Sequence, residues 1–264
     1  MNPGLNASAS GMRAQQTRID AIANNLANVN TTAFKRSRTN FEDMLYETIQ
    51  GSQLVESSGT DSLAPIQIGR GVRLAGVQRI QTQGTLEQTD NPFDLAIEGD
   101  GFFQIQLPNG ATAYTRDGTF TRAADTGQLV THDGYPLEPE ITVPPEATQV
   151  TISSTGQVTA TLGNNSQQVQ LGQIQLVRFS NPSGLLSLGG NNYSATPASG
   201  DPMPGAPMED GFGQIVQGSL ETSNVEIVQE MVDMITAQRA YEVNSKAIQT
   251  GDEMIQTVTN DLIR

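Results

Sequence analysis

Residues 223–264 have the sequence SNVEIVQEMVDMITAQRAYEVNSKAIQTGDEMIQTVTNDLIR, in which every seventh position from Ile227 is apolar or aromatic. This spacing predicts one long α-helix with a continuous stripe along one side. Ser223 and Glu226, three residues apart, have the pattern of a capping box at its start. At about 1.5 Å per residue, roughly 40 residues extend about 60 Å, and only Gly251 interrupts them. The stripe consists of Ile227, Met231, Met234, Tyr241, Ile248, Ile255 and Leu262.

The N-terminus carries the same repeat. Asn2 before Pro3 is a favourable helix start, and Asn28 or Asn30 a favourable stop, because Asn tolerates the left-handed conformation. We therefore predict a helix over residues 3–29. Its stripe consists of Leu5, Met12, Ile19 and Leu26.

A shared seven-residue repeat predicts that the two terminal helices pair as in a coiled coil. The second core row of the C-terminal helix is polar, however, with Gln238, Ser245, Asp252 and Thr259. Two interpretations stay open. Either the helices clamp the termini of a monomer, or they pack in an array of copies with one side toward water.

Between the helices the repeat shortens to two residues, as in Phe103, Ile105 and Leu107. Gly-containing turns at 99–101, 108–110, 116–118 and 132–134 favour tight hairpins. The fold class is therefore α+β, with paired long terminal helices and a mainly antiparallel β middle and outer domain. Further strands are expected at 149–153, 156–162 and 173–179.

Three parts are expected along the chain. A discontinuous helical assembly domain comprises 1–32 and 222–264, and an outer β domain comprises 93–183. Polar and Pro- or Gly-rich stretches predict that 33–92 and 184–221 are extended or β connecting regions.

The composition argues against several classes of protein. A net charge of −14 disfavours nucleic-acid binding, and the absence of Cys excludes disulfides and thiolate metal sites. No apolar run is long enough to span a membrane, and the N-terminus lacks the pattern of a cleavable signal peptide. His132 is the only His, and no phosphate loop, EF-hand or nucleophile motif is complete. We therefore expect no enzyme activity, no catalytic residue, no metal and no cofactor.

The segment ANNLANVNTTAFKR, residues 23–36, holds four Asn residues and no accompanying nucleophile or base. Asn side chains bond nearby backbone groups, so we expect this segment to shape the exit from the first helix. Phe34 would anchor the exit, and Lys35 and Arg36 would meet acidic residues of a neighbour. The predicted helix-exit motif comprises Asn24, Asn25, Asn28, Asn30, Phe34 and Lys35.

The same segment resembles the N-terminal signature of the bacterial flagellar rod and hook proteins. The resemblance continues in NPFDLAIEGDGFFQI and AYTRDGTF and resumes in the C-terminal helix, in the order that the family has. QIGRGVR at 67–73 resembles the distal rod subgroup.

The resemblance implies a structural subunit that stacks helically into a hollow shaft, the distal rod, which transmits motor torque from the proximal rod to the hook. Terminal helices would line the export channel, with Gln238, Asp252 and Thr259 facing the channel or a neighbouring subunit. The implied partners are further copies of the chain, proximal rod subunits, hook or hook-junction proteins, bushing ring proteins and the flagellar type III export apparatus. The rod would cross the periplasm, and the subunit would be exported without signal cleavage. Residues 46–74 would stiffen the rod.

Two alternatives stay open: a proximal rod or hook subunit of the same family, and a secreted acidic adhesin or binding module that uses the β domain alone.

Overall fold

The computed structural model describes residues 3–50, 66–163 and 167–262. They form two compact units. The helical unit contains the described residues of 1–27, 37–78 and 226–264, and the β unit contains those of 28–36 and 79–225. The predicted α+β class is confirmed: two long helices pack together, and the strands between them pair antiparallel wherever their register is determined. The predicted three-part domain bounds stay a prediction.

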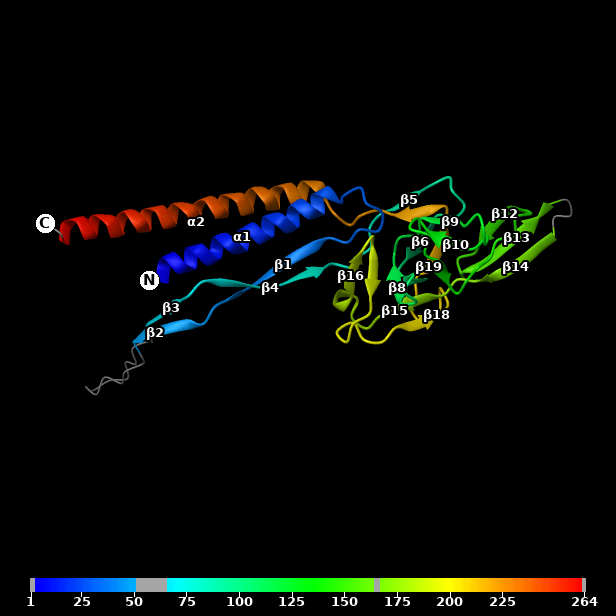
Figure 1. The fold of residues 1–264 in the computed structure, drawn as a ribbon, viewed down its shortest axis with the longest axis horizontal. Helices are drawn as coiled ribbons and strands as arrows, with labels where there is room; N and C mark the ends of the chain where they lie inside the picture. The colour runs from blue at the N-terminus through cyan, green and yellow to red at the C-terminus, as the bar shows by residue number, and fades with distance from the viewer. Residues whose placement is uncertain (1–2, 51–65, 164–166, 263–264) are drawn as a thin grey trace. The chain divides into compact units, whose positions relative to one another are not determined.

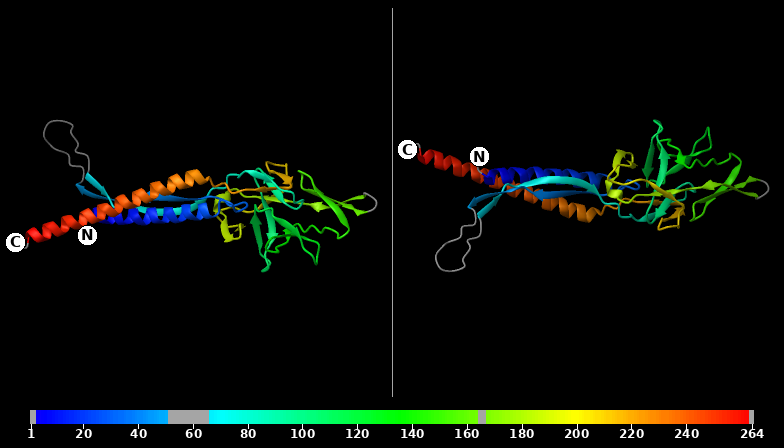
Figure 2. Two further views of the ribbon diagram at one scale, coloured as in Figure 1. Left: turned by 90° about the horizontal axis from the view of Figure 1, so that it is seen from above. Right: turned by 90° about the horizontal axis from the view of Figure 1, so that it is seen from below.

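The helical unit is built on α1 (Pro3–Ala27) and α2 (Ile227–Leu262), which lie side by side in Figures 1 and 2. A Cβ added to Gly251 would lie 2.7 Å from Leu5 Cδ2, and one added to Gly11 would lie 3.1 Å from Asn244 Nδ2. Arg18 pairs with Asp233 at 3.1 Å. Residues near the end of α2 contact residues near the start of α1, and residues near the start of α2 contact residues near the end of α1. The two helices are therefore antiparallel.

The helix ends differ in detail from the prediction. α1 ends at Ala27, two residues early, and α2 begins at Ile227, so Glu226 and not Ser223 directly precedes it. Ser223 Oγ instead accepts a hydrogen bond from the Val225 N–H. Gly251 does not interrupt α2, which is helical through this position.

A β ribbon completes the helical unit. β1 (Ser37–Asp43) pairs with β4 (Val72–Arg79), and β2 (Tyr46–Gln50) pairs antiparallel with β3 (Ile66–Gly69). The ribbon lies beside α1, because the Val72 N–H donates to Ser10 Oγ at 3.1 Å. Gly71 makes this approach possible: its φ is +110°, and a Cβ there would meet Ser10 Oγ.

The β unit contains one larger sheet and several smaller ones. In the larger sheet the strands follow the order β16, β17, β8, β7, β15, β18, and β11 also pairs with β7. Their bounds are β7 Phe102–Gln106, β8 Thr112–Thr115, β11 Leu137–Glu138, β15 Leu176–Arg178, β16 Leu186–Gly189, β17 Asn192–Ser194 and β18 Met203–Gly205.

The smaller sheets are a three-stranded one and three pairs. The three-stranded sheet contains β12 (Ala147–Ile152), β13 (Gln157–Leu162) and β14 (Gln167–Gln173). The pairs are β5 (Leu86–Gln88) with β20 (Ser219–Glu221), β6 (Leu95–Glu98) with β19 (Gln214–Gln217), and β9 (Phe120–Arg122) with β10 (Leu129–Thr131). The expected strand at 173–179 is shorter, because Gln167–Gln173 belong to β14 and only Leu176–Arg178 form β15.

The two-residue period of β7 explains the core of the β unit. Phe103 and Ile105 point into the main core, whereas Phe102 points into a second, aromatic cluster with Tyr114 and Phe179. Gly110 and Gly134 have the positive φ that their turns predict. Gly118 does not, and it is Gly for another reason: a Cβ there would lie 1.6 Å from the Leu95 carbonyl oxygen.

Within the described residues, neither helix is apolar enough to cross a membrane.

Candidate assembly surface

The apolar stripe predicted on α2 is largely uncovered in the single chain. Ile227, Met231 and Tyr241 are exposed, and Met231 keeps 52% of its surface accessible. Met234 and Ile248 are half-buried, and Ile255 is exposed. The side chain of Leu262 lies outside the described residues. Further exposed apolar residues of the same helix are Val228, Val232, Ile235, Val243 and Met254.

The row of α2 that faces α1 is a different one. It consists of residues that are small or polar and also recur every seven positions: Glu230, Ala237, Asn244 and Gly251. Glu230 and Ala237 are fully buried. Gly251 leaves room for the Leu5 side chain, since a Cβ there would lie 2.7 Å from Leu5 Cδ2, and Ala237 fits a fully buried position because it is small. Hydropathy gave no reason to choose this row, although its seven-residue spacing is visible in the sequence.

On α1, the predicted stripe is half-buried at Leu5, Met12, Ile19 and Leu26. The deeply buried positions are Ala14, Ile22 and Asn25, which the stripe does not include. Of the polar residues expected to face a channel or a neighbour, Gln238 and Asp252 are exposed, and the side chain of Thr259 lies outside the described residues.

Of the four Asn residues in the helix-exit motif, Asn25 has a clear structural role. Its Nδ2 donates to the Ser37 carbonyl at 2.9 Å and to Glu230 Oε2 at 3.1 Å, and its Oδ1 accepts from the Ser37 N–H at 2.8 Å. One side chain thus ties α1 to the first residue of β1 and to the first turns of α2. A buried amide suits this place, because it satisfies a donor and an acceptor at once.

The remaining amides have other surroundings. Asn24 and Asn30 are exposed, and Asn28 accepts from the N–H and the hydroxyl of Thr31. Neither Asn28 nor Asn30 takes the left-handed conformation that we expected. Ala33 does, with φ at 56°, and its N–H donates to the Glu221 carbonyl at 2.7 Å.

A buried charge cluster follows in the β unit. Lys35 Nζ lies 2.5 Å from Glu221 Oε1, and Arg116 Nε lies 2.9 Å from Glu221 Oε2. All three residues are nearly or fully buried. The expectation that Lys35 meets an acidic residue of a neighbour is therefore wrong, because its charge is already paired inside the chain. Sequence reasoning missed Arg116 and Glu221, which lie far from Lys35 along the chain.

Further hydrogen bonds satisfy the cluster. Lys35 Nζ donates to the Thr82 carbonyl at 2.7 Å, and Glu221 Oε1 accepts from the Gly84 N–H at 2.9 Å. Burial lowers the pKa of Lys35 and the nearby Arg116 lowers it further, while Glu221 acts in the opposite direction. Phe34, which precedes Lys35 in the sequence, is also buried, and its carbonyl accepts a hydrogen bond from the Asn224 N–H at 3.4 Å.

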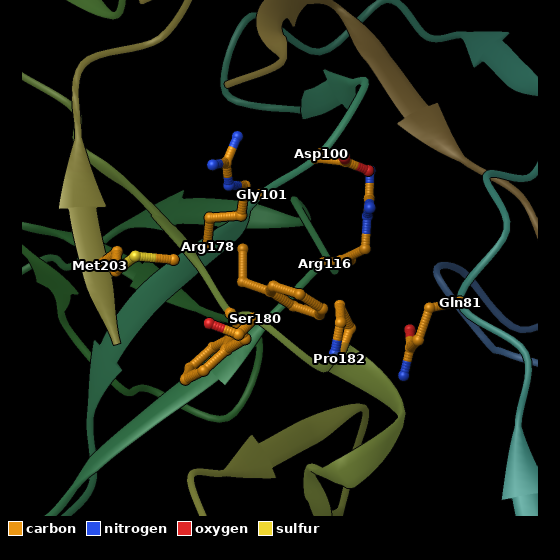
Figure 3. A pocket seen from close by; sticks show the side chains of 10 residues that line it. Gln81, Asp100, Gly101, Arg116, Arg178, Ser180, Pro182 and Met203 are labelled. Atoms are coloured by element: carbon orange, nitrogen blue, oxygen red, sulfur yellow. The ribbon is translucent and has the colours of Figure 1, made fainter. Parts of the chain in front are cut away.

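One pocket of the β unit, of about 330 Å³, is lined by charged and apolar residues (Figure 3). Its two guanidinium groups are already engaged: Arg116 also donates to the carbonyls of Ile97 and Gly99, and Arg178 donates to the Asp210 carbonyl and stacks on Phe212. Among the described residues, no three His, Cys, Asp or Glu side chains gather as metal ligands would. The two arginines of this pocket therefore stabilise the fold through contacts within the β unit.

The comparisons with known proteins match nearly the whole chain. Family models match residues 5–35 (flagella basal body rod protein), 96–160 (flagellar hook protein FlgE/F/G D1 domain) and 216–262 (flagellar basal body rod FlgEFG protein C-terminal). The flagellar basal-body rod protein FlgG of Buchnera aphidicola subsp. Schizaphis graminum is 47% identical over 98% of this chain and 99% of its own length.

The chain belongs to the flagellar basal-body rod protein family.

Other members of the family are similar to this chain over nearly its whole length. FlgG of Caulobacter vibrioides is 49% identical, with 97% of each chain covered, and FlgG of Bacillus subtilis is 40% identical over 95% of this chain and 96% of its own length. Membership places the protein in the flagellar basal body as a structural rod protein. Lys35, Arg116 and Glu221 each lie in a different one of the three matched segments. The charge cluster thus joins the parts of the chain by which the family is recognised.

Proposed function

We propose that this rod protein polymerises into the distal rod, the hollow drive shaft that carries motor torque from the proximal rod to the hook. The observation that carries the proposal is the uncovered apolar face of α2. Val228 keeps 69% of its surface accessible, Val232 keeps 53% and Ile235 keeps 50%. Exposed apolar patches of this kind mark interaction surfaces.

The energetics favour many copies. Fully burying an Ile, Val or Met side chain contributes about 1.5–3 kcal/mol relative to leaving it exposed. Several such side chains on one helix therefore offset the loss of translational freedom that association costs. A head-to-tail contact that does not close into a ring builds a helical filament, which is the geometry of a shaft.

Within this assembly, the stripes have separate roles. Leu5, Met12, Ile19 and Leu26 of α1 and the α2 stripe from Ile227 to Leu262 form the contacts between subunits. Gln238, Asp252 and Thr259 face the channel or a neighbouring copy. Asn24, Asn25, Asn28, Asn30, Phe34 and Lys35 shape the chain where it leaves α1.

The proposed role also names partners. The distal rod contacts the proximal rod subunits at one end and hook or hook-junction proteins at the other, with bushing ring proteins around it. Subunits reach it through the flagellar type III export apparatus without signal cleavage, and the rod crosses the periplasm. The role is structural, so it requires no catalytic residue and no cofactor.

A second candidate is a proximal rod or hook subunit. The matched family models name hook and rod proteins together, and the hook-basal body complex protein FlhP of Bacillus subtilis is 32% identical over 93% of this chain. Microscopy of the polymer separates these candidates, since a rod is straight and rigid whereas a hook is curved and flexible.

The direct test is to delete the gene and image isolated basal bodies. The proposal expects a stub that keeps its inner rod and lacks a hook. Basal bodies that carry a complete rod and hook without this protein would refute it.

A further inference from the structure

The two helices of the helical unit have different lengths, and α2 extends beyond the start of α1. Leu5 lies against Gly251, so the residues of α2 after about position 253 have no α1 residue beside them. This overhang continues to Leu262, about 14 Å at 1.5 Å per residue. Figures 1 and 2 show the end of α2 passing the N-terminus of α1.

The described side chains of the overhang are exposed. Met254 keeps 64% of its surface accessible, and Glu253 next to it is also exposed. Adjacent helical residues lie about 100° apart around the axis, so Glu253 flanks the face on which Met254 lies. The overhang therefore presents an apolar side chain with a carboxylate at its edge.

A groove lined by apolar and positively charged residues lies between α1 and the ribbon. It has a volume of about 280 Å³ and is lined by Ser10, Arg13, Ala14, Thr17, Met44, Val72, Arg73 and Leu74. Met44 and Leu74 are exposed apolar residues.

Two of the residues that line this groove are arginines, Arg13 and Arg73. Arg73 pairs with Glu42 at 2.8 Å, whereas Arg13 is exposed and has no ion pair with any residue in the described part of the chain. A carboxylate from outside can therefore pair with Arg13 without breaking an ion pair between described residues.

We propose that the α2 overhang of one copy binds the α1–ribbon groove of another copy, with Met254 against Met44 and Leu74 and Glu253 paired with Arg13. The occupant is a second copy because an apolar side chain flanked by a carboxylate matches an apolar groove with an arginine that has no ion pair among the described residues. This inference rests on the proposed function and deepens it by assigning one contact of the polymer.

The absence of Cys in the chain allows a clean cross-linking test. Two tagged genes replace the natural one in the same cell, one encoding Leu74→Cys and the other Met254→Cys. Both positions are exposed, so neither change removes a core side chain. Basal bodies are isolated, oxidised and separated on a denaturing gel.

The proposal expects a dimer of about twice 28.2 kDa that carries both tags and appears only when both variants are present. Cells that express either variant alone are the controls. Complete rods and hooks without this dimer would overturn the contact and leave the proposed function intact. Basal bodies that are complete but contain neither tagged chain would overturn the proposed function itself.

A charge exchange tests the same contact without Cys. Arg13→Glu should reduce swimming and the number of complete rods, and Glu253→Arg in the same chain should restore both. Single and double variants with equal rod counts would overturn the pairing of Glu253 with Arg13.

Discussion

Glu221 holds Lys35 and Arg116 on its two carboxylate oxygens, at 2.5 Å and 2.9 Å, in the interior of the β unit. The segment around Lys35 also bonds the segment around Glu221 through the Ala33 N–H. The cluster therefore links residues near the start of the β unit, at Lys35, with residues near its end, at Glu221.

Glu221→Gln should destabilise the β unit by about 3–5 kcal/mol, because it leaves two buried cations without a carboxylate. Lys35→Met should cost less, because Glu221 keeps Arg116. Urea unfolding followed by tyrosine fluorescence measures both changes, with the exposed Glu87→Gln as control. An equal loss for Glu221→Gln and the control would show that the cluster does not stabilise the fold.

Asp117 gives stability an unusual dependence on pH. Burial raises the pKa of Asp117 above its ordinary value of 3.8, and the charge of Asp133 raises it further. The folded state therefore holds this proton at pH values where the unfolded state has lost it. The free energy of unfolding should fall as pH rises from 3.8 through the raised pKa.

Asp117→Asn removes the titrating carboxyl group. It keeps an oxygen that can accept hydrogen bonds from the Thr119 N–H and hydroxyl, as Asp117 Oδ1 does. The stability of the variant relative to the natural chain should increase with pH across this window. Urea midpoints at several pH values measure the difference. A difference that does not change with pH would rule out the raised pKa.

Ala237 is fully buried in α2, on the row that faces α1. Ala237→Leu should cost about 1–3 kcal/mol, because the added side chain has no space between closely packed helices. Ala247→Leu, at an exposed position of the same helix, is the matched control and should leave stability nearly unchanged. The helix signal in circular dichroism during urea unfolding measures both, and equal midpoints would place Ala237 outside the seam.

The helices were predictable because their signals are local. A seven-residue repeat and a Pro near the start predict α1, and the same repeat predicts α2, to within a few residues. Hydropathy failed to identify the row that faces α1, because Ala237 and Gly251 act through small size and Glu230 through hydrogen bonding. The ion cluster could not be predicted either. Lys35 precedes β1 and Glu221 lies in β20, and no local sequence pattern specifies that these two distant segments meet.

The central claim is that the uncovered face of α2 joins one subunit to the next. Met231→Asp places a charge on that face, and Met231→Leu keeps the face apolar as a matched control. Electron microscopy of basal bodies, with circular dichroism of the purified variants to confirm folding, gives the answer. We predict complete rods and hooks with Met231→Leu and stubs without hooks with Met231→Asp, whereas complete rods and hooks with a folded Met231→Asp chain would contradict the account.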